Sequence, residues 1–236
     1  ISRSLASIEK QLGVSLFDRV TGQTTNVGPD LTGFNRNVRT MPIEWSPTDW
    51  NTLFYANDAV FKTTDRGHSW TRISGDLARQ TWDVPANTGK YASTVTPAPL
   101  GSITALSPSP RDVKVLWTGT DDGVIQVTHD GGAHWRNVTP PAMEPWSKVT
   151  QLDASRFDTS TVYASVSRFR VDDLHPYIYR THDGGRTWQQ ITTGIPDDEP
   201  VNVVREDPVR RGLLYAGTER ATYVSFDDGG HWQSLR

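Results

Sequence analysis

The sequence contains no cysteine, and this absence excludes several classes of site. A chain without cysteine has no disulfide, no thiolate nucleophile and no Cys-ligated zinc. The sequence also lacks an apolar run near the roughly 18 residues that a membrane helix needs, and it shows no charged-then-apolar leader. We therefore expect no membrane span.

Neither sign of charge predominates in the sequence. It has 24 Lys and Arg and 27 Asp and Glu, which gives a formal net charge of −3. Such a balance provides no general basic field for a phosphate backbone. There is no Gly-rich phosphate loop, no Gly-x-Ser-x-Gly elbow and no His-Glu-x-x-His pair. We expect no cofactor, and a nucleic-acid partner is not favoured.

Tryptophan, glycine and proline are plentiful by contrast, with 9 Trp, 19 Gly and 15 Pro. Glycine and proline interrupt helices, while aromatic side chains suit the half-buried surface of a pleated strand. The composition favours an all-β fold of short strands and many turns.

One motif recurs four times along the chain. Each copy has a Ser or Thr, an Asp two residues later, a Gly two after that, and a Trp three further on. The carboxylate can accept backbone N–H groups across a tight turn, the glycine supplies positive φ, and the tryptophan starts the next strand with a large apolar surface. We assign a structural role to Asp65, Gly67 and Trp70; Asp130, Gly132 and Trp135; Asp183, Gly185 and Trp188; and Asp227, Gly229 and Trp232.

Each copy follows two short β-type runs, so every repeat is expected to contain about four strands, which is the blade of a β-propeller. The expected blades cover residues 40–74, 102–139, 148–192 and 200–236, within one propeller region at 20–236. Four blades with long connections suggest part of a seven- or eight-bladed ring. Its exposed blade faces would allow self-association.

The four copies resemble the Asp-box, or BNR, repeat of sialidases, sortilin-type receptors, photosystem assembly factors and xyloglucan-degrading glycosidases. Residues 20–236 further resemble large bacterial exported proteins of sortilin-like or glycosyl-hydrolase-like type, through segments such as Phe61–Asp65, Thr81–Pro85 and Gly119–Gly123. The resemblance implies a propeller fold and an exported or periplasmic location. It is weakly informative about function, because the motif forms hairpin turns in unrelated members.

Residues 1–19 depart from this pattern. Leu5, Ile8 and Leu12 have helical spacing, and Gly13 is a natural helix end. The segment resembles the recognition helix of LysR-type winged helix-turn-helix regulators. Since the helices that would support such a reading head are missing, we interpret it as a LysR-like helical remnant at a junction, and DNA binding is not favoured.

The remaining chemistry is sparse. Five of the six histidines lie inside the motif copies, and equivalent positions on successive blades are far apart, so no metal site is expected. Two segments, 74–101 and 171–176, are expected to be inter-blade loops that bind a ligand. Their candidate binding residues are Trp82, Asp83, Tyr91, Asp172, Asp173 and His175, and the carboxylates that could serve a catalytic role are Asp83 and Asp122.

These observations favour a non-catalytic binding or scaffold propeller that contacts a protein or a glycan through its loops. The alternative is a fragment of an Asp-box glycoside hydrolase, which needs two carboxyl groups roughly 5–10 Å apart across one sugar. A third interpretation, transcriptional regulation through residues 1–19, predicts salt-sensitive binding to duplex DNA.

Overall fold

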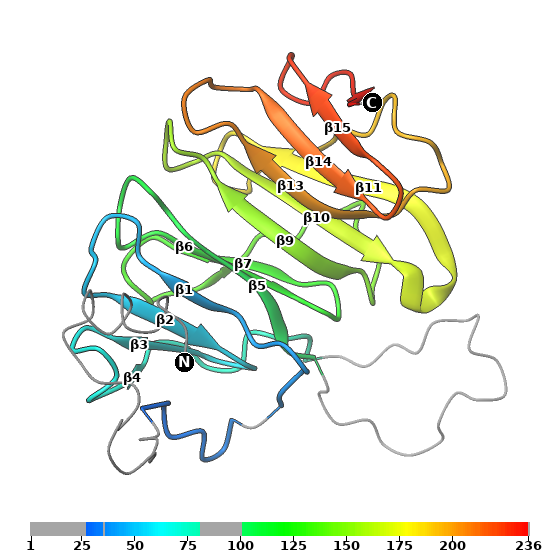
Figure 1. Ribbon diagram of the computed structural model, residues 1–236. Helices are drawn as coiled ribbons and strands as arrows, with labels where there is room; N and C mark the ends of the chain where they lie inside the picture. Colours follow the sequence, from blue (N-terminus) through cyan, green and yellow to red (C-terminus); the bar gives the residue numbers. More distant parts are fainter. Residues whose placement is uncertain (1–26, 35, 81–100, 236) are drawn as a thin grey trace, which may run out of the picture.

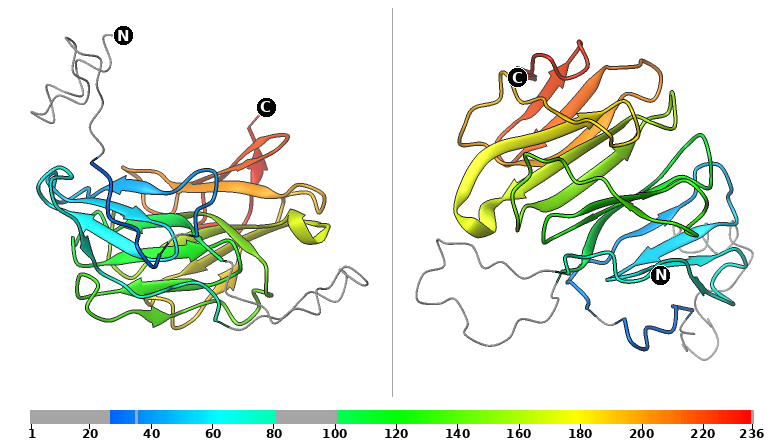
Figure 2. Two further views of the ribbon diagram at one scale, coloured as in Figure 1. Left: turned by 90° about the horizontal axis from the view of Figure 1, so that it is seen from below. Right: turned by 180° about the vertical axis from the view of Figure 1, so that it is seen from behind.

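The computed structural model describes residues 27–34, 36–80 and 101–235. In this part of the chain, strands form four antiparallel sheets of four strands each, in sequence order within every sheet. Figures 1 and 2 show the sheets following one another from the blue and cyan N-terminal blade to the red C-terminal one. The all-β class and the partial propeller of about four blades are confirmed.

Each blade is one sheet. Blade 1 contains β1 (Ile43–Trp45), β2 (Leu53–Ala56), β3 (Val60–Thr63) and β4 (Thr71–Arg72). Blade 2 contains β5 (Ile103–Pro108), β6 (Leu116–Thr120), β7 (Ile125–Thr128) and β8 (Arg136–Asn137). Blade 3 contains β9 (Lys148–Ala154), β10 (Val162–Arg168), β11 (Asp173–Thr181) and β12 (Gln189–Gln190), and blade 4 contains β13 (Val201–Glu206), β14 (Leu214–Thr218), β15 (Thr222–Ser225) and β16 (Gln233–Ser234).

The hydrophobic core lies between blades, because neighbouring sheets pack face to face. Phe54 of blade 1 packs with Ile103 and Leu116 of blade 2, and separate clusters fill the next two interfaces. All five residues of β6 are buried, as expected for a strand covered on both sides. First strands contact each other from blade to blade, β1 with β5, β5 with β9 and β9 with β13, so they form the inner wall of the arc.

Antiparallel pairing sorts the connections onto two ends of the blades. The turns between first and second strands lie at the same end as the motif turns between third and fourth strands. We call this end the motif face. The turns between second and third strands and the connections between blades lie on the opposite face.

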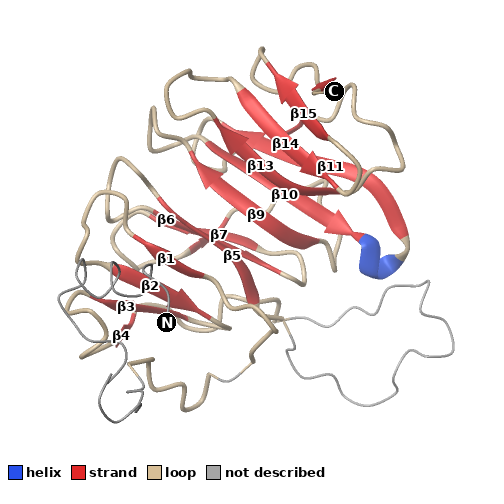
Figure 3. Ribbon diagram, in the orientation of Figure 1, coloured by secondary structure: helices blue, strands red, loops and turns tan. Residues whose placement is uncertain are grey.

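The segment 171–176 is not an inter-blade loop, which corrects the expectation from sequence. It belongs to the β10–β11 hairpin inside blade 3, where Asp172 alone separates η2 (Phe169–Val171) from β11. Figure 3 shows this short helix at the tip of the hairpin. The expected helix at residues 1–19 lies outside the described residues.

The described residues contain no helix with the length and the apolar character that crossing a membrane requires.

Candidate functional site

The four motif turns share one hydrogen-bond pattern, illustrated by the second copy. Thr128 donates its hydroxyl to Asp130 Oδ1 at 2.8 Å, and Gly132 donates its N–H to Thr128 Oγ1 at 2.9 Å. Asp130 Oδ1 also accepts the N–H of His134 at 2.9 Å. The same bonds occur at Asp65, Asp183 and Asp227, so these carboxylates are engaged in holding their own turns. They hold turns on the motif face rather than converging on a substrate.

A different set of side chains does converge, at the ends of the four inner strands on the motif face. Glu44, Ser107, Asp153 and Arg205 occupy equivalent register positions, each opposite the aromatic residue of its second strand. Together with Trp45, Arg156 and Glu206 they line a cavity of about 170 Å³ at the mouth of the central channel. We call it the channel-mouth cavity.

Its carboxylates are held to different degrees. Asp153 accepts Arg205 Nη1 at 2.7 Å and the N–H of Glu206 at 2.7 Å. Glu206 accepts the Ser155 hydroxyl at 2.6 Å and the N–H of Gly212 at 3.1 Å. Glu44 extends from β1 toward the same space and is the least constrained of the three.

Desolvation affects the protonation of two of these carboxyl groups. It raises the pKa of Glu44, although this side chain is exposed on β1, against a smaller opposite effect of the Arg205 guanidinium. Burial also raises the pKa of Asp153, despite its bonds from Glu206 and Arg205. Two carboxyl groups with raised pKa in one cavity are typical of acid–base chemistry. An aromatic side chain beside them, Trp45, offers a surface for a sugar ring.

The candidates named from sequence lie elsewhere. Trp82, Asp83 and Tyr91 lie outside the described residues. Asp122 is 3 % exposed, and its carboxylate accepts the Thr120 hydroxyl at 2.6 Å and the N–H of Arg79 at 3.0 Å. Burial raises its pKa, but its oxygens are committed to joining the linker after blade 1 to blade 2.

Asp172, Asp173 and His175 are together at the β10–β11 hairpin on the opposite face. Asp173 accepts Arg168 Nε at 2.8 Å and the Tyr177 hydroxyl at 2.8 Å, and its other oxygen lies 2.8 Å from His175 Nδ1. Asp172 is exposed and ends η2 with a φ of 61°. The hairpin is thus internally bonded, and its role in ligand binding stays a prediction.

The sequence did not single out Glu44, Asp153 or Glu206, which lie about 50 or more residues apart in the chain. The signal in the sequence that could have identified these residues was their position within each blade. Each of Glu44, Ser107, Asp153 and Arg205 faces the aromatic of the neighbouring strand, and only the blade register shows that these positions meet.

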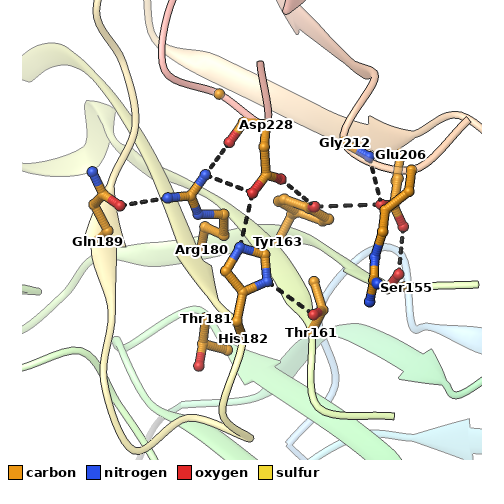
Figure 4. A network of polar contacts seen from close by, with 12 residues as sticks. Ser155, Thr161, Tyr163, Arg180, Thr181, His182, Gln189, Glu206, Gly212 and Asp228 are labelled. Carbon is orange, nitrogen blue, oxygen red and sulfur yellow. Dashed lines mark hydrogen bonds and ion pairs between the residues drawn. The ribbon is translucent and has the colours of Figure 1, made fainter. Parts of the chain in front are cut away.

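No group of three or more His, Asp or Glu side chains in the described ranges is arranged to hold a metal ion. One histidine instead joins a polar network between blades 3 and 4 (Figure 4). Asp228 accepts the Tyr163 hydroxyl at 2.6 Å and Arg180 Nη1 at 2.8 Å, and it lies 2.8 Å from His182 Nε2. Burial, the hydrogen bond to Asp228 and the nearby charges of Glu206 and Asp228 raise the pKa of Tyr163.

Comparison with known proteins gives two curated relatives, while no protein-family model matches the chain. The chain is 28% identical over 193 residues to a xyloglucanase of Paenibacillus sp, covering 73% of this chain and 16% of that protein. It is 25% identical over 162 residues to a probable oligoxyloglucan-reducing end-specific xyloglucanase of Neosartorya fischeri, covering 64% of this chain and 17% of that protein. The chain therefore spans about a sixth of the length of these relatives.

Solved structures support the fold. The chain superimposes on an ancestral GH74 enzyme with a TM-score of 0.61 at 19% identity, over 82% of this chain and 23% of the other. It also matches the Cps50 (Swd1) β-propeller domain of Myceliophteria thermophila with a TM-score of 0.52 at 10% identity, over 79% of this chain and 54% of the other. Both likenesses support a propeller.

The two curated relatives contradict the expectation of a non-catalytic binding or scaffold propeller. They favour the alternative of a glycoside hydrolase fragment.

Proposed function

We propose that this chain is the propeller part of a glycoside hydrolase that acts on a β-glucan of the xyloglucan type. The observation that carries the proposal is the sequence similarity to two curated xyloglucanases, which extends over 64% and 73% of the chain. The motif resemblance adds the finer assignment to Asp-box propellers. The resemblance to sortilin-like bacterial exported proteins is kept here as a further part of the proposal.

The channel-mouth cavity is the proposed sugar site. A volume of about 170 Å³ lies below the roughly 300 Å³ of the smallest drug-sized pockets, which suits one sugar unit rather than a longer chain. Trp45 is 41 % exposed at its rim and offers a flat apolar surface to a sugar ring. Arg205 and Arg156 supply donors for sugar hydroxyls.

Within this site Glu44 is the proton donor. Desolvation raises the pKa of its side chain, which is the direction that a general acid requires. It would protonate the glycosidic oxygen that leaves, while Asp153 accepts the proton of the attacking water. Arg205 holds Asp153 in place for this step.

The test measures both hydrolysis and binding of xyloglucan oligosaccharides. Glu44→Gln should lower the rate of reducing-end release by about 100-fold or more, because general acid catalysis contributes 10²–10⁴. Glu219→Gln, at an exposed glutamate on the opposite face, is the matched control and should leave the rate unchanged.

Binding is tested separately by calorimetry, which does not depend on turnover. Trp45→Ala should weaken oligosaccharide binding by about tenfold, through loss of the stacking surface. Trp50→Ala is the matched control, since Trp50 is 68 % exposed and lies outside the cavity. Equal effects of the two tryptophan variants, or full activity of Glu44→Gln, would show that the cavity is not the sugar site.

A further inference from the structure

In blade 4 the residue after the motif aspartate, Asp228, lies against blade 3. Its carboxylate stands between two cationic groups, with Oδ2 at 2.8 Å from Arg180 Nη1 and at 2.8 Å from His182 Nε2 (Figure 4). Arg180 also donates to the backbone carbonyl of Asp228. A carboxylate of blade 4 thus fills a position that basic side chains of blade 3 surround.

Blade 3 has glycine at the same position. Gly184 and Asp228 have φ of 72° and 62°, and each donates its N–H at 2.9 Å to the turn between the first two strands of its own blade. In the motif of blade 2, His129 has the place that His182 has in blade 3. The interface between blades 2 and 3 therefore keeps the turn and the histidine but has no carboxylate at this position.

The basic side chains of blade 2 enclose the space in which that carboxylate would lie. Arg136 Nη2 donates to Gly184 O at 2.6 Å, just as Arg180 donates to Asp228 O. A Cβ added to Gly184 would lie 3.8 Å from Arg136 Nη2 and 3.8 Å from His129 Nε2, which is ordinary contact distance. An acidic group therefore fits between the guanidinium and the imidazole without displacing either.

This space belongs to a cavity of about 490 Å³ on the motif face, which we call the interblade cavity. Its lining includes two arginines and two histidines: Arg136, Arg186, His129 and His182. None of its lining residues also lines the channel-mouth cavity. The volume falls within the range of roughly 300–1,000 Å³ that is typical of ligand pockets.

The charge that is left unpaired in the interblade cavity is positive. Asp183 is the one carboxylate among the described residues of the lining, and its own motif turn engages it: Oδ1 accepts the N–H of Arg186 at 2.9 Å and Oδ2 accepts the Thr187 hydroxyl at 2.7 Å. Across the part of the chain that the structure describes, the guanidinium groups of Arg136 and Arg186 form no ion pair. An anion would give them a partner.

His129 reports on this positive environment. Burial has the largest effect on its pKa and lowers it, and the charges of Arg136 and Arg186 lower it further, while Asp130 and Asp112 act in the opposite direction. An anion bound beside the imidazole would favour its protonated form and raise this pKa. The site therefore has a signature that can be measured.

We propose that the interblade cavity binds the carboxylate group of a small ligand, either a free carboxylic acid anion or a uronic acid. The ligand carboxylate takes the place beside Gly184 that the Asp228 side chain fills at the next interface. Arg136 donates to it, His129 contacts it, and the rest of the ligand occupies the remaining volume. This site is separate from the proposed hydrolytic site and does not depend on it.

The experiment titrates the full chain at constant ionic strength with sodium glucuronate, sodium acetate and glucose, and follows the His129 imidazole by NMR. His129→Gln identifies its resonances among those of the six histidines. Both carboxylates should shift these resonances and raise the pKa of His129, and glucose should do neither. Glucuronate binding that is tighter than acetate binding by about tenfold would assign the site to an acidic sugar, and equal binding would assign it to a free anion.

Gly184→Asp is the decisive variant, because it supplies the carboxylate from the chain and removes no group of the site. It should weaken glucuronate binding by about tenfold or more, since the added side chain pairs with Arg136. Gly131→Asp is the matched control at the same motif position. Gly131 has a φ of 76° and nothing lies within 4 Å of its added Cβ, so this variant should bind glucuronate as the wild type does.

Arg136→Gln tests the guanidinium and provides a second readout if Gly184→Asp does not fold. It should weaken binding of both carboxylates by about tenfold, whereas Arg220→Gln, at an arginine 61% exposed on the opposite face, should not. Three results would overturn the proposal: unchanged glucuronate binding by Gly184→Asp or Arg136→Gln, equal responses to glucuronate and glucose, or no response to either carboxylate up to about 100 mM.

Discussion

The motif turn requires two successive residues with positive φ, and only the second is always glycine. The first is Gly131 with φ 76° in blade 2 and Gly184 with φ 72° in blade 3, but Arg66 with φ 64° in blade 1 and Asp228 with φ 62° in blade 4. A non-glycine residue there costs of order 1–2 kcal/mol. At Asp228 the bonds to blade 3 offset this cost, so the exception marks an interface.

Acid should weaken the motif turns through their aspartates. Hydrogen bonds from the side chain and N–H of Ser69, and from Thr63, lower the pKa of Asp65 to about 2. An unfolded aspartate titrates near 3.9. Because the folded pKa is the lower one, the stabilisation is complete above about pH 4 and is lost as the pH falls toward 2. Asp65→Asn should therefore lower the urea midpoint at pH 7 and have little effect near pH 2.

The matched control for this prediction is Asp197→Asn, at an exposed aspartate between blades 3 and 4. Its difference from the wild-type urea midpoint should stay constant across the same pH range. If the effect of Asp65→Asn were equally independent of pH, the carboxylate charge would not be what holds the turn.

The motif could be recognised from sequence because most of its bonds are local. Asp65 bonds residues within four positions of itself, so spacing alone carries the pattern. Glu44 and Asp153 meet only through the register of separate blades. No local pattern could identify that pair.

The β10–β11 hairpin shows why element boundaries were harder to predict. Asp172, Asp173 and Pro176 favour a loop by residue type, yet Asp173–Thr181 is a strand of nine residues. Pairing between β10 and β11 shifts register between Val166 and Arg168, and this irregularity accommodates a proline that has no N–H to donate. Arg168 then holds the tip of the hairpin through side-chain hydrogen bonds, which strand and turn propensities do not describe.

Arg168 should be the residue that keeps this hairpin folded. Its guanidinium bonds Asp173 Oδ2 at 2.8 Å, Glu144 Oε2 at 2.6 Å and Ser147 Oγ at 2.9 Å, and its side chain is 12% exposed. Arg168→Met keeps much of the stem but leaves Asp173 without its cation, so it should lower the free energy of unfolding by about 2 kcal/mol. Urea unfolding measures this loss, and hydrogen exchange should show faster opening at η2.

Arg170→Met is the control within the same hairpin. Arg170 makes one ion pair, with Asp121 at 2.8 Å, and its side chain is 55% exposed. The Asp121 side chain is 11% exposed, but it keeps the N–H of Ser102 at 2.8 Å and the guanidinium that it loses is largely in water, so we expect a loss below about 1 kcal/mol. Similar losses for the two variants would mean that the Arg168 network has no special role in the hairpin.

At the scale of the whole molecule, blades are joined by matching faces rather than by one central core. The sequence predicted the number of blades because each repeat carries its own turn. The second strand of blade 1 carries two adjacent aromatic residues, and strand pairing makes Phe54 rather than Tyr55 the equivalent of Trp117 and Tyr163. Phe54 is 2% exposed, because this position always faces the following blade.

The bond network at Asp228 should contribute measurably to the cohesion of blades 3 and 4. Asp228→Gly relieves a φ of 62° but removes the carboxylate that pairs with Arg180 and the close acceptor of the Tyr163 hydroxyl, a residue only 1 % exposed. Losing acceptors for buried donors costs about 1–3 kcal/mol each, which exceeds the strain relieved. We expect the free energy of unfolding, measured in urea, to fall by about 2 kcal/mol, and hydrogen exchange in β13 and β14 to become faster.

Asp172→Gly is the matched control, since Asp172 has a φ of 61° but is exposed, and it should be neutral or stabilising. If both glycine variants gained stability, strain would outweigh the network and cohesion would rest on apolar packing alone.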